Sequence, residues 1–352
     1  MNWRELLQVW GSLPRGCLNL NAAHQQEQQQ KRQQKKLQRG VALILVLWFI
    51  VLLGVLALGL SKVSRNNALV ARQLSGVTQA RHLAEGGAQV VLANLLMASD
   101  EERLLGDGEE FTLSFEQGKV ELLLYNESGK ININQASEAL LVRLFTAHEI
   151  PLEQSEALAG AIADWRDEDD LVRLHGAEDE DYFAAGLAYG AADSAFTSVS
   201  ELRKVLGMEE NIYQQIEADV TIYSKSPGVN PKVAPLNVLL AISDLDPSAL
   251  QHYIKERRRT HRAGLPLPPV PLIEQSFLAS DEGDMFSLSA LATTAQSSVG
   301  GQSVVFELIE KAGKISVKRL YSQPYVQPTA LPAGHQQGQG RTEKFDMSVE
   351  EK

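Results

Sequence analysis

The most prominent hydrophobic feature of the chain is an apolar run over residues 41–61 that contains no charged side chain. Arg39 and Lys62 flank it. A helix of about 20 apolar residues, each rising about 1.5 Å, spans the hydrocarbon core of a bilayer. A buried helix of a soluble protein is the alternative, but such helices seldom lack a polar face over this length. We therefore predict a transmembrane helix over residues 41–61.

The sequence after this run favours a continuation of the same helix to about Met97. Apolar residues recur there at roughly helical spacing, namely at Leu69, Leu74, Val77, Leu83, Val90, Val91, Leu95 and Leu96. We therefore expect one long helix that runs from the membrane segment into the domain that follows.

Two short segments of alternating polarity come next, at residues 111–115 and 119–125, with a glycine between them. Alternation of this kind around a short turn predicts a β-hairpin. The same alternation returns at residues 303–309 and 314–321. We expect these later strands to complete the sheet that the hairpin begins.

The sequence between these two groups of strands has a helical composition. Ser137 can cap one helix, Pro151 opens a second, and residues 229–254 are expected to form a third. The predicted fold class is therefore α+β, with a long N-terminal transmembrane helix packed on a small antiparallel sheet and a large inserted α-helical domain. The expected segments are a basic leader at 1–40, a transmembrane helix at 41–61, a helix continuation and first hairpin at 62–128, an inserted helical domain with an acidic loop at 129–270, the remaining strands at 271–325, and a disordered tail at 326–352.

Charge is divided unevenly between the two sides of the apolar run. The whole chain has a net charge of −11, but seven basic and two acidic residues precede Val41, which leaves +5 there and −16 on the remainder. A short basic segment before a membrane helix stays in the cytoplasm, so the acidic remainder is expected to be exported. An acidic domain is a poor candidate for binding nucleic acid. The one cysteine, Cys17, lies in the cytoplasmic part, so no disulfide is expected in the exported part.

The leader ends in a feature that suggests proteolytic processing. Residues 25–39 are rich in Gln, Lys and Arg without apolar periodicity, and we expect them to be disordered. A cut between Gly40 and Val41 removes the leader but leaves the apolar helix on the mature protein, whereas a secretory signal is cut after its apolar stretch. This arrangement resembles the prepilin signal, which a membrane peptidase cuts after a glycine. A plain signal anchor is the alternative.

A long N-terminal helix on a small antiparallel sheet also resembles the plan of the pilins. In most pilins and pseudopilins the fifth residue after the cut is Glu, whereas this chain has Leu45. The acid neutralises the N-terminal ammonium of the subunit above, because an unpaired charge in the bilayer costs several kcal/mol. A subunit with no neighbour above it needs no acid. The resemblance therefore implies that this chain is the topmost subunit of a filament.

Carboxylates are concentrated in the inserted domain. Residues 164–181 contain nine carboxylates and two arginines, for a net charge of −7. Ca²⁺ binds about six to eight oxygens, and an acidic loop interrupted by glycine suits it better than Mg²⁺ or Zn²⁺. If Asp167 is taken as the first residue of an EF-hand loop, Glu178 is the twelfth, but Val172 stands where the turn requires glycine. The sequence favours a calcium loop of another type, and a solvated acidic loop is the alternative.

The order of several motifs resembles the type II secretion system (general secretion pathway) protein K family, whose members are minor pseudopilins. The resemblance extends from about Gln38 to about Tyr325. The motifs are Arg39-Gly40-Val41-Ala42-Leu43-Ile44 with Leu45 next, Gly129-Lys130-Ile131-Asn132-Ile133-Asn134, Asp164-Trp165 with Asp167 and Asp169, Gly176-Ala177-Glu178-Asp179 with Tyr182, Ser200-Glu201-Leu202, and Gly228-Val229-Asn230-Pro231.

The resemblance implies a helical domain inserted in a pilin-like sheet and a structural Ca²⁺ in the acidic loop. The candidate ligands that carry over are Asp167, Asp169, Asp170, Glu178 and Asp179. It also implies a non-catalytic tip subunit that primes and caps the periplasmic pseudopilus for export of folded proteins. The implied partners are other minor pseudopilins through the N-terminal helix, the prepilin peptidase, the inner-membrane platform and the inner membrane, with a cytoplasmic N-terminus and a periplasmic C-terminal domain.

Enzyme motifs are missing from the sequence. It has no G-x-S-x-G, P-loop or Rossmann glycine pattern, and His148-Glu149 lacks the second histidine of a zincin. Two non-enzymatic alternatives remain. Residues 131–141 resemble the opening of a helix-hairpin-helix DNA-binding motif, although residues 148–153 are acidic and lack the glycine that would approach phosphate. A calcium-stabilised envelope adhesion domain on a permanent anchor is the other alternative.

Overall fold

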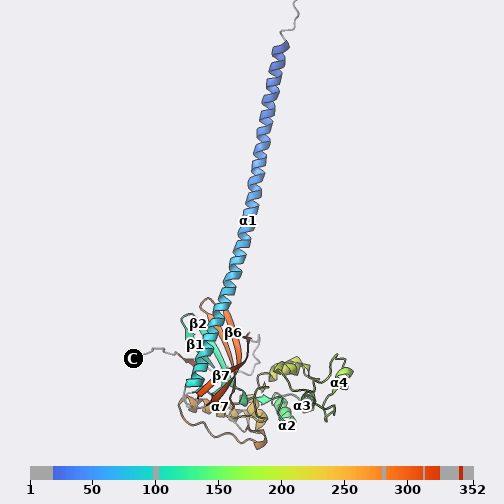
Figure 1. Ribbon diagram of the computed structural model, residues 1–352, viewed down its shortest axis with the longest axis vertical. Helices are drawn as coiled ribbons and strands as arrows, with labels where there is room; N and C mark the ends of the chain where they lie inside the picture. The colour runs from blue at the N-terminus through green and yellow to red at the C-terminus, as the bar shows by residue number, and fades with distance from the viewer. Residues whose placement is uncertain (1–18, 98–102, 280–282, 312–313, 326–340, 344–352) are drawn as a thin grey trace, which may run out of the picture. The chain divides into compact units, whose positions relative to one another are not determined.

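The computed structural model describes residues 19–97, 103–279, 283–311, 314–325 and 341–343. The chain divides into two units, residues 1–72 and residues 73–352, and each is described by itself. Figure 1 shows the elements of both units. The expected tail at 326–352 lies outside the described residues, except for a short strand at Arg341–Glu343 that replaces the disorder expected there.

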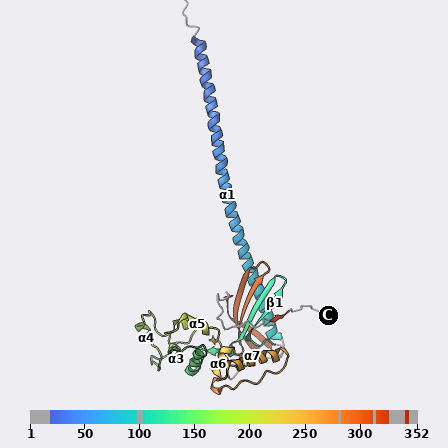
Figure 2. The same ribbon diagram turned by 180° about the vertical axis from the view of Figure 1, so that it is seen from behind.

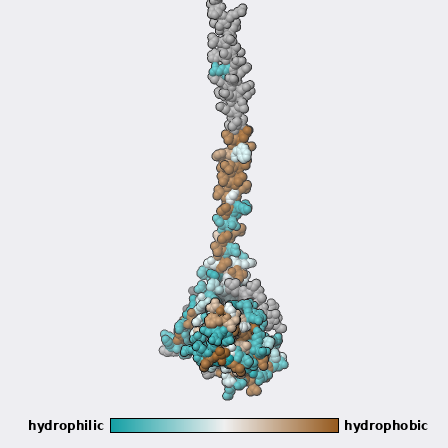
Figure 3. Space-filling view, turned by 90° about the vertical axis from the view of Figure 1, so that its right-hand side faces the viewer, coloured by the Kyte–Doolittle hydropathy of each residue, from teal (hydrophilic) through white to brown (hydrophobic). Residues whose placement is uncertain are grey.

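Helix α1 extends from Asn19 to Met97, which confirms the predicted continuous helix. Among the described residues, one helix is long and apolar enough to cross a membrane, and its most apolar window is entirely unburied. Figure 3 shows this window as brown apolar surface on the helix. The disorder expected for residues 25–39 was wrong, because α1 already includes them. Gln, Lys, Arg and Leu are good helix formers, and a helix that is already nucleated extends through them without an apolar stripe.

The last turns of α1 belong to the second unit and pack on its sheet. Their buried side chains recur every three or four residues and are small at first, which allows a close approach: Ala80, Ala84, Ala88, Val91 and Leu95. Gly87 contributes to this closeness, because a β-carbon there would lie 2.8 Å from Cγ1 of Val120. Gly86, on the neighbouring face, has no other atom within 4 Å of the equivalent position.

The sheet has six strands in the order β7-β6-β5-β2-β1-β8, and all neighbours are antiparallel except β8, which is parallel to β1. The predicted hairpin is confirmed as β1 and β2. Strand β5 was not predicted. Its Ser and Ala residues obscure the alternation of apolar and polar side chains, which is visible only in the burial of those side chains. The strands are β1 (Asp107–Phe115), β2 (Gly118–Asn126), β5 (Met285–Thr294), β6 (Val299–Lys311), β7 (Lys314–Tyr325) and β8 (Arg341–Glu343).

The residues between β2 and β5 form the predicted helical insert. It contains the 3-10 turns η1 (Glu127–Gly129), η2 (Val199–Lys204) and η3 (Gln275–Phe277), the paired short strands β3 (Ile131–Asn132) and β4 (Val220–Thr221), and helices α2 (Glu138–Ala147), α3 (Leu152–Arg166), α4 (Asp179–Ala184), α5 (Glu210–Ile216), α6 (Leu236–Ile242) and α7 (Pro247–Arg262). Ser137 caps α2 as predicted, since its Oγ accepts from the backbone N–H of Leu140 at 3.3 Å.

The single helix expected over residues 229–254 was wrong. Residues 229–235 are not helical, and the rest is divided between α6 and α7. Pro247 begins α7 because its fixed φ suits a first helical turn and its missing N–H needs no partner there. Asp246 caps the helix by accepting from the backbone N–H of Ser248 at 2.7 Å.

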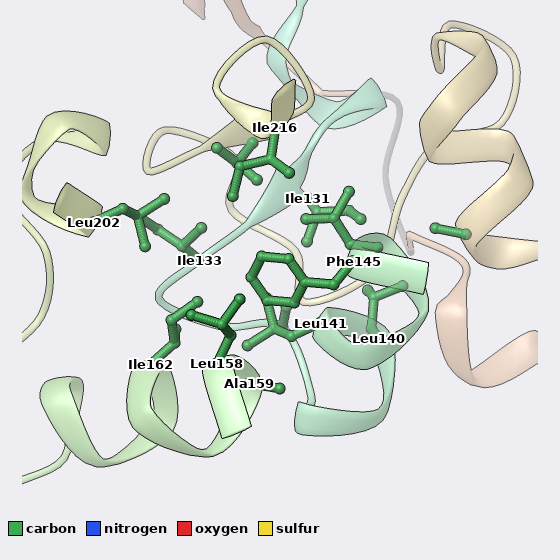
Figure 4. Packing of buried hydrophobic residues seen from close by; sticks show 14 of the residues in the cluster. Ile131, Ile133, Leu140, Leu141, Phe145, Leu158, Ala159, Ile162, Leu202 and Ile216 are labelled. Carbon is green, nitrogen blue, oxygen red and sulfur yellow. The ribbon is translucent and has the colours of Figure 1, made fainter. Parts of the chain in front are cut away.

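Each half of the second unit has its own hydrophobic core. The sheet core joins α1 to β1, β2, β5 and β6. The insert core gathers side chains from β3, α2, α3, η2 and α5, as Figure 4 shows for Ile131, Phe145, Leu158, Leu202 and Ile216. The structure is therefore α+β, with a long helix on an antiparallel sheet and an inserted helical domain.

Candidate calcium loop and the family of the chain

The acidic loop lies between α3 and α4, and its central residue is Arg173. The Arg173 guanidinium donates to Oδ1 of Asp164 at 2.8 Å and also contacts Oδ2 of Asp167. The backbone N–H of Arg173 donates to Oδ2 of Asp164 at 3.2 Å. Hydrogen bonds to Asp167 and then Asp164 raise the pKa of Arg173 above its usual range. One guanidinium therefore links the buried end of α3 to the start of the loop.

Glycine at position 176 lets the loop pass close over Asp164. A β-carbon there would lie 1.8 Å from Oδ2 of Asp164, closer than any side chain allows. Asp164 itself is fully buried near the end of α3. The Gly176-Ala177-Glu178-Asp179 motif thus brings the second acidic group of the loop back to the first.

Glu178 is the buried carboxylate of this second group, with 6% of its surface exposed. Burial, followed by the charges of Asp164 and Asp167, raises its pKa to about 7. Its Oε1 atom is buried without a hydrogen-bond partner, and so is Oδ1 of Asp167. A buried carboxylate oxygen without a donor is costly, so both atoms have unused capacity to bind a cation.

The other three predicted ligands are exposed. Asp169 and Asp170 are exposed, and Oδ1 of Asp169 accepts from the backbone N–H of Leu171 at 3.0 Å. Oδ1 of Asp179 accepts from the backbone N–H of Ala191 at 3.0 Å. Asp167 and Glu178 therefore each have a buried oxygen without a partner, whereas Asp169, Asp170 and Asp179 are exposed.

Two further acids near the centre were not among the predicted ligands. Asp164 belongs to the Asp164-Trp165 motif but was not predicted to be a metal ligand. Asp193 comes from the segment after α4, and its pKa is raised by desolvation and then by the charges of Asp179, Asp170 and Asp167. No local pattern marks Asp193, because it is a single acid separated from the acidic run by apolar and small residues.

Aromatic side chains support the base of the loop. The ring centroid of Trp165 lies 5.8 Å from that of Tyr182, 6.0 Å from that of Phe196 and 6.4 Å from that of Tyr189. The Tyr182 hydroxyl accepts from the backbone N–H of Leu206 at 3.1 Å. This cluster fixes the end of α3 against α4 and places Trp165 as a fluorescent reporter beside the acidic groups.

The donor set suits a hard cation by its chemistry. All candidate donors are carboxylate oxygens, which Ca²⁺ prefers, and two of them are buried without a partner. Within the described ranges, no three His, Cys, Asp or Glu side chains are arranged to hold a metal ion. The calcium site thus stays a prediction that the chemistry of Asp167 and Glu178 supports.

The predicted processing site and tip marker lie on α1. Gly40 and Val41 are both within the helix. Leu45 lies in the apolar stretch with 63% of its surface exposed. Their proposed roles stay predictions.

Comparisons with known proteins agree on one family. A family profile described as "Type II secretion system (T2SS), protein K" matches residues 119–225. Type II secretion system protein K of Pseudomonas aeruginosa is 29% identical over 248 residues, which cover 63% of this chain and 73% of that protein. The protein of the same name from Klebsiella pneumoniae is 28% identical over 200 residues, covering 51% of this chain and 61% of that protein.

A comparison with solved structures also gives a match. It is a chain from the crystal structure of the GspK-GspI-GspJ complex of the enterotoxigenic Escherichia coli type 2 secretion system, with 18% identity and a TM-score of 0.49. The match covers 75% of this chain and 99% of that chain. The family profile and both named relatives give the same similarity: the matched parts of the chain resemble the type II secretion system protein K family.

Proposed function

We propose that the protein is a minor pseudopilin of a type II secretion system, a non-catalytic tip subunit of the periplasmic pseudopilus. The observation that carries this proposal is the make-up of α1. One helix contains both an apolar segment of membrane-spanning length and a row of small residues packed on an antiparallel sheet. Similarity to the protein K family supports the same role.

Processing precedes assembly in this proposal. The prepilin peptidase cuts between Gly40 and Val41, so the basic leader is lost and α1 begins at the apolar segment. The basic leader places the N-terminus in the cytoplasm and the sheet and insert in the periplasm, by the positive-inside rule.

Assembly joins α1 to the helices of other minor pseudopilins and to the inner-membrane platform. Helices in lipid associate through shape and small residues rather than hydrophobicity. A β-carbon added at Gly54 or Gly59 would have no other atom within 4 Å, so both positions are free for a neighbouring helix. Together these subunits prime the filament for the export of folded proteins.

Two features suit the top of the filament. Leu45 replaces the acid that would neutralise a subunit above. The insert, which extends from η1 to η3, adds bulk to one end of the sheet. These features favour a cap that blocks further addition above the subunit.

A structural Ca²⁺ completes the proposed function. Asp167 and Glu178 would hold it at the buried centre, with Asp169, Asp170 and Asp179 at the margin. When bound, the ion supplies positive charge to the concentrated carboxylates and links α3 to the start of α4.

The test is complementation of a bacterium that lacks its own protein K gene. The full chain is expected to restore release of a folded type II substrate into the medium. A variant without the insert, residues 127–277, is expected to be made and membrane-bound but inactive in release. Equal release without this chain, or with the variant, would contradict the tip role.

A further inference from the structure

The two sides of the six-stranded sheet are protected in different ways. On one side lies β7, a strand of 12 residues whose only neighbour among the described strands is β6. β7 contains Lys318, Arg319 and Pro324, and its pairing with β6 shifts register between Val305 and Phe306. Charged side chains, proline and a bulge prevent an open edge from pairing with another chain. The residues of β7 therefore guard this edge by themselves.

The last long strand on the other side is β1, and residues 111–115 of this strand have no such guard. They read Phe-Thr-Leu-Ser-Phe, without a charged side chain or a proline. Phe111 and Leu113 are buried in the sheet core, so the segment is held flat against the neighbouring strand. Uncharged segments of this kind pair readily with another strand when their backbone edge is open.

A short segment from the C-terminal part of the chain covers this unguarded strand. Residues Arg341–Glu343 form β8, which pairs in parallel with Phe111, Thr112 and Leu113. Figure 2 shows β8 as a short red strand beside β1. Although β7 is the preceding strand in the chain, it lies at the opposite edge of the sheet. The chain therefore returns to the far edge and pairs there with backbone groups that β1 would otherwise leave open.

The first part of β1 is already engaged by α7. Asp107 pairs with Arg257 and Arg258, and Glu109 contacts Arg262. These contacts occupy the beginning of the strand. The part of β1 that depends on β8 is therefore the uncharged segment over residues 111–115.

We propose that β8 is a built-in cover of β1, which prevents two copies of this chain from pairing edge to edge through residues 111–115. The segment is complementary to itself: in an antiparallel pair centred on Leu113, each Phe111 lies opposite Phe115 of the second copy. Such a contact is symmetric and closes at two copies, because each β1 edge is used once. This inference goes beyond the proposed function and does not depend on it.

The test compares the self-association of truncated chains in detergent micelles by sedimentation equilibrium. Deletion of residues 341–352 removes β8 and is expected to lower the dissociation constant of the dimer at least about tenfold relative to the wild type. Deletion of residues 344–352 is the matched control, because it keeps β8 and the same α1. It is expected to associate no more strongly than the wild type.

Thr112→Lys in the chain without residues 341–352 tests whether this association uses β1. The added ammonium lies opposite Glu121 of β2, which favours the strand within its own sheet, whereas two such lysines repel each other across a pair of β1 strands. The substitution is expected to return the dissociation constant to the wild-type value. A synthetic peptide of residues 338–346, added to the same truncated chain, is expected to do so as well by restoring β8.

Glu343→Pro keeps the chain at full length and guards against failure of the truncated chain to fold. It removes one backbone donor of β8 and is expected to strengthen self-association by a smaller factor than the deletion. Dissociation constants equal to the wild type for both the deletion of residues 341–352 and Glu343→Pro would overturn the cover. Association that neither Thr112→Lys nor the peptide reverses would place the contact on another surface and would overturn it too.

Discussion

Arg257 of α7 and Asp107 of β1 form a buried ion pair, with Nη2 of Arg257 2.9 Å from Oδ2 of Asp107. Arg258 donates to the same oxygen from Nε at 2.8 Å. Arg257 also donates to the backbone carbonyls of Pro231 and Ala234. These contacts fasten the insert to the first strand of the sheet, and Figures 1 and 2 show α7 beside the sheet from both sides.

Asp107→Asn is therefore expected to lower the free energy of unfolding by about 3 kcal/mol or more, because two arginines lose their shared charge partner and one stays buried. Asp244→Asn removes the same charge from an exposed pair with Arg143 and is expected to cost at most about 1 kcal/mol. Urea unfolding of the full chain in detergent, followed by circular dichroism, measures both. Equal losses in the two variants would contradict a fastening role for Asp107.

The α1–sheet contact predicts opposite outcomes for two adjacent glycines. Gly86→Ala is expected to stabilise the protein by about 0.5–1 kcal/mol, since alanine favours a helix and the position is open. Gly87→Ala is expected to be less stable than Gly86→Ala by about 1–3 kcal/mol, because its methyl group would press on Val120. Urea unfolding of the full chain in detergent measures the free energy of unfolding of both variants. A Gly87→Ala protein as stable as Gly86→Ala would show that α1 does not pack this closely.

Glu178 predicts a pH dependence of stability in the absence of calcium. Its pKa in the fold is about 7, above the ordinary value of 4.5, because burial disfavours the ionised form. The unfolded chain therefore releases this proton first as pH rises. This group should lower stability progressively between pH 4.5 and 7 and add no further slope above that range.

The comparison with Glu178→Gln isolates this effect from other acids. The difference in melting temperature between variant and wild type is expected to shift in favour of the variant as pH rises from 4.5 to 7. Added calcium is expected to remove the shift by stabilising the carboxylate. A difference that stays constant with pH would show that the carboxyl is not desolvated.

Local patterns in the sequence were sufficient for α1 from the apolar segment onward and for the β1–β2 hairpin. Helical spacing and strict alternation are properties of neighbouring residues, so one sequence reveals them. Long-range partners could not be found in this way. Asp107 and Arg257 are far apart in the chain, and no local pattern pairs them.

For the candidate site, the sequence indicated the acidic loop but did not distinguish the acids within it. The concentration of acids indicated the loop, and within it Asp167 and Glu178 each have a buried oxygen without a hydrogen-bond partner. Charge counting could not distinguish those two from exposed Asp169 and Asp170. Nor could it reveal that Arg173 neutralises Asp164, because that depends on how the chain returns over Gly176.

Leu45→Glu tests the tip assignment. An added carboxylate at the top of the filament would have no ammonium to neutralise and is expected to reduce release of a folded substrate at least several-fold. Leu45→Ile is the control and is expected to retain release, since it keeps an apolar side chain. Improved release by Leu45→Glu, or incorporation of labelled chain along the filament shaft, would contradict the tip position.

The central claim is that the chain is a processed pseudopilin, and the mass of its mature N-terminus tests this most directly. The chain is purified from membranes of a bacterium with an active prepilin peptidase and analysed by mass spectrometry. The account predicts that the mature protein begins at Val41 and retains the apolar segment over residues 41–61. A mature protein that still contains the basic residues before Gly40, or one cut after the apolar segment, would contradict it.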